Sequence, residues 1–134
     1  MEGFRFSIPM TVRVSDLNYG NHVGYERYLT FFQEARMGYL ARLGCSELDL
    51  YGAGIIVSEV NCKYKRELNL GDEIEVGARI SSIKPKLFKM EYEIWMDQEC
   101  CAEGNTLSFC FDYQEKKVAR FDKRFIEQVK ALED

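Results

Sequence analysis

The sequence predicts one α+β domain, over residues 1–134, in which a long apolar helix and a curved antiparallel sheet bury each other. Three observations lead to this class. The length of 134 residues fits a single domain. No Gly or Pro interrupts the chain between Gly24 and Gly38, where apolar residues follow a helical period. Four strand-like stretches follow, joined by short turns, so neighbouring strands should be antiparallel.

The first strand is expected in residues 4–14, which place apolar side chains at every second position. Pro9 has no N–H to donate to a neighbouring strand, so we expect it at a sheet edge or a bulge. The strand leads into a loop that carries Asp16 and Asn18. If the extended backbone continues, these two side chains point to the same side.

The helix is expected from about residue 23 to residue 43. Two apolar rows run side by side, so the apolar stripe is wider than a surface helix needs, and other elements should enclose it. At 1.5 Å per residue the helix is roughly 30 Å long. Gly44 stands where a left-handed cap would end it. The rows are Tyr28, Phe32, Ala35, Tyr39 and Leu43, and beside them Leu29, Arg36, Leu40 and Leu43.

The rest of the chain predicts four more strands and a short closing helix. Turn residues separate the strands at residues 69–72, 84–86 and 97–99. The expected order is therefore β-α-β-β-β-β, a five-stranded sheet, followed by a helix that Asp122 caps. The strands fall at residues 56–65, 74–80, 88–96 and 107–113, and the first of them places Ile56, Ser58, Val60, Cys62 and Tyr64 on one face.

Composition argues against several classes of protein. The formal net charge is −4, whereas a general nucleic-acid binder normally shows a basic face. No apolar run approaches the ~20 residues needed to span a bilayer, so no membrane partner is expected. The N-terminal residues lack the apolar region of a secretory signal, so we expect a cytoplasmic protein.

The five cysteines indicate reduced thiols rather than a disulfide framework, because their number is odd and Cys100 and Cys101 are adjacent. There is no C-x-x-C motif, and His22 is the only histidine, so we expect no metal site and no cofactor. A cysteine nucleophile paired with His22 is an alternative, although no cysteine lies in a recognisable motif.

The loop before the helix is the candidate site. A carboxylate (Asp16), an amide (Asn18) and an imidazole (His22) directly precede the helix start. A helix N-terminus offers unpaired N–H groups and roughly half a positive charge, so it can stabilise an oxyanion that develops during a reaction. Each residue also has a structural alternative: a cap for Asp16, a turn residue for Asn18 and a fixed loop for His22.

Three strings, in this order, carry a resemblance to a known family. Residues 15–23 are similar to D-x-D-x-x-G-H/I-V, residues 28–36 to Y-x-x-Y/F-x-x-x-x-E-A-R, and residues 64–72 to Y-x-x-P-L-x-x-G-D. Over almost the whole chain they resemble the hotdog-fold thioesterases, in particular the 4-hydroxybenzoyl-CoA thioesterase family. The resemblance implies a hotdog fold with its helix wrapped by the sheet, a homodimer or homotetramer, and hydrolysis of an acyl thioester, usually acyl-CoA.

The resemblance also implies roles for the loop residues. The catalytic aspartate of the family, a nucleophile or general base, falls on Asn18, and an amide cannot do that work. Our hypothesis is that Asp16 activates water or attacks directly, and that Asn18 orients that water or the carbonyl. His22 either shares in proton transfer or fixes the loop. The backbone N–H that polarises the thioester carbonyl maps near Tyr25. Asn18 also supports a rival function, a non-catalytic thioester-binding or assembly domain of the same fold.

The implied substrate is an acyl-CoA or an acyl-carrier-protein thioester. Because the chain is acidic overall, CoA phosphates would need local basic groups, although each lysine is also readable as solvated surface. Glu34 is expected to pair with an arginine, and Glu59 can face a dimer cleft. The candidate substrate-binding residues are Glu59, Lys63, Lys65, Arg66 and Lys86.

Overall fold

Six strands, two helices and one short 3-10 turn make up the computed structural model, which describes all of residues 1–134. The predicted order, a strand, a long helix and then consecutive strands, is confirmed. The elements are β1 (Ser7–Thr11), the turn η1 (Val14–Asp16), α1 (Tyr25–Arg42), β2 (Gly54–Tyr64), β3 (Glu73–Ile83), β4 (Leu87–Met96), β5 (Glu99–Asp112), β6 (Lys117–Val118) and α2 (Lys123–Glu133).

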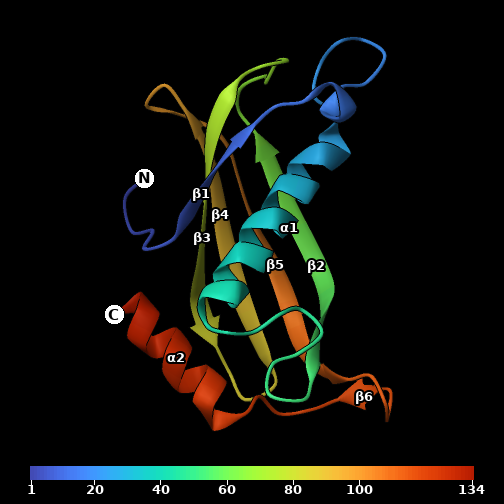
Figure 1. Cartoon of the computed structure of the whole chain (residues 1–134), viewed down its shortest axis with the longest axis vertical. Helices are drawn as coiled ribbons and strands as arrows, with labels where there is room; N and C mark the ends of the chain where they lie inside the picture. The colour runs from blue at the N-terminus through green and yellow to red at the C-terminus, as the bar shows by residue number, and fades with distance from the viewer.

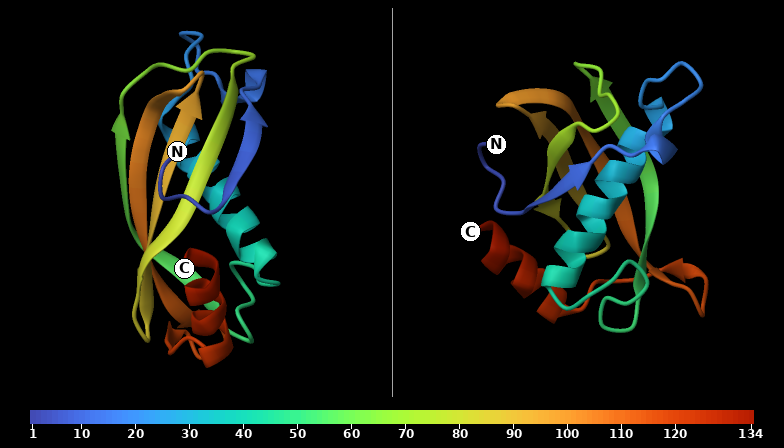
Figure 2. Two further views of the ribbon diagram at one scale, coloured as in Figure 1. Left: turned by 90° about the vertical axis from the view of Figure 1, so that its left-hand side faces the viewer. Right: turned by 45° about the horizontal axis from the view of Figure 1, so that its top comes forward.

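The sheet is antiparallel throughout, as predicted. Its strands run in the order β1-β3-β4-β5-β2, and β6 pairs with β5 outside this path. Figure 1 shows α1 lying across one face of the sheet, and Figure 2 shows the strands curving around it. This is the helix-in-sheet arrangement that the hotdog resemblance implied. The edges of the main sheet are therefore β1 and β2.

The helix and the sheet meet through the predicted apolar row. Phe32 and Tyr39 of α1 are buried, and the Phe32 ring stacks on that of Tyr92 from β4 with centroids 4.5 Å apart. Burial of one such large side chain stabilises the fold by about 1.5–3 kcal/mol. Position 104 of β5 requires glycine, because a Cβ there would lie 2.7 Å from the Phe32 ring. The close approach of α1 to the sheet thus depends on Gly104.

The sheet has one strand more than predicted, and β5 is longer. β5 begins at Glu99 rather than at residue 107, and β6 forms after the turn that follows β5. The missed half of β5 lacks clear alternation, because Cys100 and Cys101 are adjacent and Gly104 has no side chain. It is nonetheless a strand because β4 and β2 pair with it on both sides.

A β-bulge changes the predicted face of β2. The register with β5 shifts between Val57 and Glu59, and this reverses the alternation of side chains. Ile55 is consequently buried and Ile56 is 41% exposed. The prediction that Ile56 shares a face with Val60 is therefore wrong.

The first strand is shorter than predicted, but Pro9 lies where it was expected. β1 pairs only with β3, so Pro9 is on an edge strand. At the other end of the chain, the predicted cap of α2 is present: the Asp122 carboxylate accepts the N–H of Arg124 at 2.8 Å.

Two further observations concern the chain as a whole. No helix in the structure combines the length and the apolar character that crossing a membrane requires. All five cysteines are unpaired, with Cys101 and Cys110 buried and the other three half-buried. Free thiols were expected from the sequence.

Candidate active site

The loop between η1 and α1 is a tight hairpin built on Asn18. The Asn18 N–H donates to the carbonyl of His22 at 2.8 Å, and Leu17 pairs with Val23. The Asn18 side-chain oxygen accepts the N–H groups of Gly20 at 2.8 Å and of His22 at 3.3 Å. Asn18 therefore shapes the turn with its oxygen, while its side-chain NH2 group makes no hydrogen bond within the protein.

The start of α1 offers uncapped donors. Gly24 occupies the cap position and no side chain caps the helix, so the N–H groups of Tyr25 and Glu26 have no acceptor within the protein. The Glu26 carboxylate lies beside this helix start, so close that a Cβ on Gly24 would be 2.5 Å from its Oε1. Such a helix start can receive a carbonyl oxygen or an oxyanion.

A hollow of about 410 Å³ opens at this helix start. It brings together five of the residues selected from the sequence, which are Asn18, His22, Tyr25, Lys65 and Arg66. Its other lining residues are Val23, Tyr28, Tyr64 and Glu67. Polar groups from two distant parts of the chain therefore converge beside the free N–H groups of α1.

His22 is paired with a carboxylate in this hollow. Its Nδ1 contacts Oε1 of Glu67, and both side chains are about half exposed. A carboxylate on Nδ1 orients an imidazole and leaves Nε2 to exchange protons with a substrate or water. The sequence reasoning missed Glu67, although a signal existed: in Tyr-Lys-Arg-Glu-Leu it stands where the family turn has proline.

Three tyrosines form the apolar wall of the hollow. The ring of Tyr64 contacts those of Tyr25 and Tyr28, with centroids 5.1 and 4.8 Å apart. The Tyr64 hydroxyl donates to the Tyr25 carbonyl at 3.1 Å, and the Tyr28 hydroxyl donates to the Arg66 carbonyl at 3.3 Å. Burial raises the pKa of both Tyr28 and Tyr64 to about 12, so these phenols stay neutral donors at ordinary pH.

Asp16 lies outside this hollow, and both of its carboxylate oxygens accept hydrogen bonds within the protein. It is 5% exposed. Its Oδ2 accepts the Arg13 N–H at 2.9 Å, and its Oδ1 accepts two bonds from Arg27, at 2.9 and 3.2 Å. Its carbonyl accepts the Gly24 N–H at 3.2 Å. Asp16 therefore has a structural role: its hydrogen bonds hold η1 against the start of α1.

The predicted substrate-binding residues are only partly brought together. Lys65 pairs with Glu103 at 3.1 Å and Arg66 pairs with Glu99, both at the rim of the hollow. Lys63 lines a different hollow, and Glu59 is exposed next to the bulge of β2. Lys86 lies in the turn between β3 and β4, at the end of the sheet opposite to the start of α1 (Figure 1).

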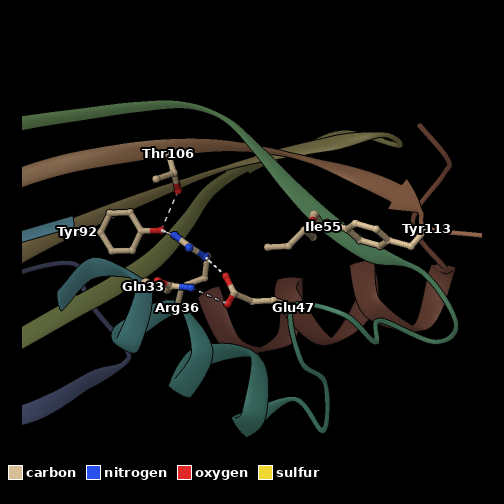
Figure 3. A network of polar contacts seen from close by, with 7 residues as sticks. All are labelled: Gln33, Arg36, Glu47, Ile55, Tyr92, Thr106 and Tyr113. Atoms are coloured by element: carbon tan, nitrogen blue, oxygen red, sulfur yellow. Dashed lines mark hydrogen bonds and ion pairs between the residues drawn. The ribbon is translucent and has the colours of Figure 1, made fainter. Parts of the chain in front are cut away.

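A buried polar network links α1 to the sheet farther along the helix (Figure 3). Arg36 donates from Nε to Glu47 at 2.7 Å and from Nη1 to the Tyr92 hydroxyl at 2.9 Å. The Tyr92 hydroxyl also bonds to that of Thr106 at 2.7 Å. Glu34 forms no ion pair, so the expectation that it pairs with an arginine is wrong: the acidic partner of Arg36 comes from the loop after α1.

Comparisons with known families agree with this architecture. A family model described as the thioesterase-like superfamily matches residues 12–129. Among curated proteins, the chain is 26% identical over 121 residues to an acyl-CoA thioesterase, YbgC, of Haemophilus influenzae, covering 88% of this chain and 89% of that protein.

Solved structures of thioesterases are also similar to this chain. A thioesterase from Thermus thermophilus, complexed with coenzyme A and Zn, superposes with a TM-score of 0.88 at 27% identity, covering 99% of this chain and 97% of that one. Slr0204 from Synechocystis, a 1,4-dihydroxy-2-naphthoyl-CoA thioesterase, has a TM-score of 0.86 at 18% identity, covering 96% and 98%. The second likeness concerns the fold alone, and both confirm the hotdog arrangement.

Proposed function

Because the chain belongs to the thioesterase-like superfamily, we propose that it is an acyl-CoA thioesterase, which hydrolyses an acyl thioester to the free acid and CoA. The observation that carries the proposal is the hollow at the start of α1, where the His22–Glu67 pair faces uncapped N–H groups. The similarity to the YbgC thioesterase over most of both chains supports the same activity.

The thioester carbonyl binds at the helix start. Its oxygen accepts the N–H of Tyr25, and the positive end of α1 stabilises the charge that develops on it. One well-placed donor of this kind contributes roughly 3–4 kcal/mol to transition-state stabilisation in other enzymes. The carbonyl displaces the exposed Glu26 carboxylate from this end of the helix.

His22 is the general base in this proposal, and Glu67 orients it. Nε2 takes a proton from a water molecule as the water oxygen bonds to the carbonyl carbon. The tetrahedral intermediate then collapses, the C–S bond breaks, and His22 returns the proton to the sulfur of CoA. The free side-chain NH2 group of Asn18 donates to the attacking water. Asp16 takes no direct part, because both of its oxygens are occupied.

Lys65 and Arg66 supply the contacts for the phosphates of CoA. Both lie at the rim of the hollow and are partly exposed, so phosphate oxygens can compete with Glu103 and Glu99 for them. A carrier-protein thioester would use the same two residues. The five unpaired thiols suit a reducing compartment, which supports placement in the cytoplasm.

A second copy of the chain pairs along β2 in this proposal. β2 is a sheet edge of 11 residues, and Ile56 and Val60 are exposed on it. The opposite edge, β1, has only 5 residues and contains Pro9, which cannot donate to a partner strand. A homodimer along β2 would place Glu59 at the junction, and a homotetramer would join two such pairs.

A panel of acyl-CoA substrates of increasing chain length, with detection of the released thiol, tests the activity. Turnover that is lost in His22→Ala supports the enzyme. Tight binding of acyl-CoA without release of thiol at any chain length would instead favour the rival function, a thioester-binding domain of the same fold.

A further inference from the structure

A second hollow lies between α1 and β2, farther along the helix than the candidate active site. Its volume is about 240 Å³. Pockets for whole drug-sized ligands are usually about 300–1,000 Å³, so this space fits the end of a chain rather than a complete molecule. We call it the α1–β2 groove, and it is lined by Leu29, Thr30, Phe32, Gln33, Arg36, Val57, Val60 and Thr106.

Arg36 adds an unused charged donor to this groove, in which four of the eight lining residues are apolar. The residue is 6% exposed. Its Nε and Nη1 bond to Glu47 and Tyr92, whereas its Nη2 makes no hydrogen bond within the protein (Figure 3). The hydroxyl of Ser108 is the only unpaired polar side-chain group that is sealed from solvent. Because Nη2 is not among the sealed groups, part of it is accessible, and the α1–β2 groove is the hollow that Arg36 lines.

The charges around Arg36 select the kind of group that fits. Glu47 already balances the guanidinium at 2.7 Å. A ligand carboxylate would bring a second negative charge into a dry site and be costly. A plain hydrocarbon would cover Nη2 and leave it unpaired, which is also unfavourable. A hydroxyl or carbonyl oxygen accepts the free N–H of Nη2 without adding a buried charge and without leaving the donor unpaired.

The separation of the two hollows sets the length of the ligand. Tyr25 and Arg36 lie on the same helix, with Cα atoms roughly 16 Å apart at 1.5 Å per residue. Because helical side chains lean toward the N-terminus, the path from the thioester to the guanidinium is on the order of 10–15 Å. An extended chain advances ~1.2 Å per bond, so about 8–12 bonds cover this distance. A single aromatic ring is too short.

We propose that the α1–β2 groove binds the far end of the acyl group and that Arg36 recognises a hydroxyl or carbonyl oxygen there. The preferred substrates are then medium-length acyl thioesters that carry oxygen at or near the terminal carbon. This inference rests on the proposed function, because it takes the thioester to lie at the start of α1.

Tyr25 and Tyr64 line the first hollow, and Leu29, one turn farther along α1, and Val60, four residues earlier in β2, line the second. The ring centroids of Tyr25 and Tyr64 are 5.1 Å apart. Tyr25 is 75% exposed, so its ring can turn toward solvent. The proposal requires this movement to open a passage along α1 from the thioester to Leu29 and Val60.

Three matched substrates test the assignment on the unmodified protein. Each is an acyl-CoA of about ten carbons, and they end in a methyl, a hydroxyl or a carboxylate group. The hydroxyl-terminated chain should have a kcat/KM at least about tenfold above that of the methyl-terminated chain. A thioether analogue of each, in which the thioester carbonyl is a methylene, should bind in the same order, which measures recognition without turnover.

Two variants locate the effect. Arg36→Lys keeps a cation for Glu47 but removes the second edge of the guanidinium, so the hydroxyl-to-methyl ratio of kcat/KM should fall to within about twofold. Val57→Phe narrows the groove and should lower the ratio of ten-carbon to two-carbon kcat/KM by about tenfold. Val118→Phe, an equal enlargement on the exposed strand β6, should leave all ratios unchanged.

The outcomes separate this inference from the proposed function. If no acyl-CoA is hydrolysed, the proposed function fails. If acyl-CoA is hydrolysed but the methyl and hydroxyl chains are equal, or the carboxylate chain is preferred, the role of Arg36 is overturned and the function stands. If Val57→Phe and Val118→Phe behave alike, the acyl end does not occupy the α1–β2 groove.

Discussion

Asn18 and Glu67 are the two residues at which this chain departs most informatively from the family motifs. The loop acid of the family is replaced by Asn18, whose oxygen holds the hairpin. The turn proline is replaced by Glu67, which contacts His22. The two changes meet in one hollow, so we infer that the carboxylate lost from the loop is supplied from the turn after β2, acting through the imidazole.

Replacement of His22 by alanine should lower kcat by about 10²–10³-fold, because the water then lacks its base. KM should change little, since His22 does not hold the CoA. Glu67→Gln should give a smaller loss, because the imidazole remains but is less well oriented. Tyr19→Ala is the control, since Tyr19 lies in the same loop and is fully exposed. Equal rates for His22→Ala and Tyr19→Ala would remove His22 from the mechanism.

The variant Asp16→Asn tests whether Asp16 has a structural role or a catalytic one. The substitution keeps the shape but weakens the bonds to Arg13 and Arg27, so the free energy of unfolding should fall by about 2–3 kcal/mol. The pH dependence of kcat in the fraction that remains folded should match that of the unmodified protein. Urea titration measures the first effect and steady-state kinetics the second. An unchanged stability with a rate reduced a thousandfold would make Asp16 the catalytic base or nucleophile.

The buried phenol of Tyr28 makes stability depend on alkaline pH. Burial raises the pKa of Tyr28 to about 12, above the value of about 10 for an exposed tyrosine. The unfolded chain therefore loses this proton at lower pH than the folded protein does. A contribution of about 2–3 kcal/mol is complete below pH ~10 and is lost as the pH rises toward ~12.

Tyr28→Phe should lessen the fall in stability with rising pH without abolishing it, because burial raises the pKa of Tyr64 to about 12 as well. Tyr19→Phe should leave the slope unchanged. The free energy of unfolding, measured by urea titration at several pH values between about 9 and 12, gives the two slopes. Identical slopes for the unmodified protein and Tyr28→Phe would show that another group controls stability in this range.

At the level of elements, the sequence predicts the helices and strands that have a clear periodicity. It misses those that are defined by pairing with adjacent strands. α1 and β4 have clear periods and lie where they were expected. The first half of β5 contains adjacent cysteines and Gly104, so only its pairing with β4 and β2 defines it. The bulge in β2 leaves no mark on a list of residue types, because Ser58 fits a regular strand as well as a bulge.

Deletion of Ser58 tests the bulge directly. Without the extra residue, β2 would regain regular alternation and one half of it would turn its apolar side chains away from α1. The free energy of unfolding should fall by at least about 3 kcal/mol. Ser58→Ala keeps the residue and loses only the bond from its hydroxyl to the Leu107 carbonyl, so it should cost about 1 kcal/mol or less. Thermal unfolding of both variants provides the comparison.

At the scale of the whole molecule, the family motifs predicted the fold and the position of the site, but not which side chains face it. Asn18, His22, Tyr25, Lys65 and Arg66 share the hollow as a group because the loop and the turn after β2 meet at the helix start. Asp16 and Lys86 do not line this hollow. Asp16 lies in η1, where its side chain is buried, and Lys86 lies in the β3–β4 turn, at the end of the sheet opposite to the start of α1. Which side chains reach the hollow is decided by contacts between elements that are distant in the sequence, and residue spacing alone does not reveal these contacts.

Pairing of two copies along β2 predicts a particle of twice the chain mass of 15.6 kDa. The double variant Ile56→Glu and Val60→Glu places like charges on the exposed strand and should shift the sedimentation equilibrium mass to that of one chain. The control variant Thr11→Glu, at an exposed position of the opposite edge strand β1, should leave the mass unchanged. Loss of the dimer in both variants alike would place the interface elsewhere.

The unequal edges of the sheet also limit how far assembly can go. When two copies join through β2, their outer ends are both β1 strands, and each of these is short and carries Pro9. No open row of donors is left for a third molecule to extend. In the proposed dimer, Pro9 would therefore limit the further addition of strands at both outer edges of the sheet.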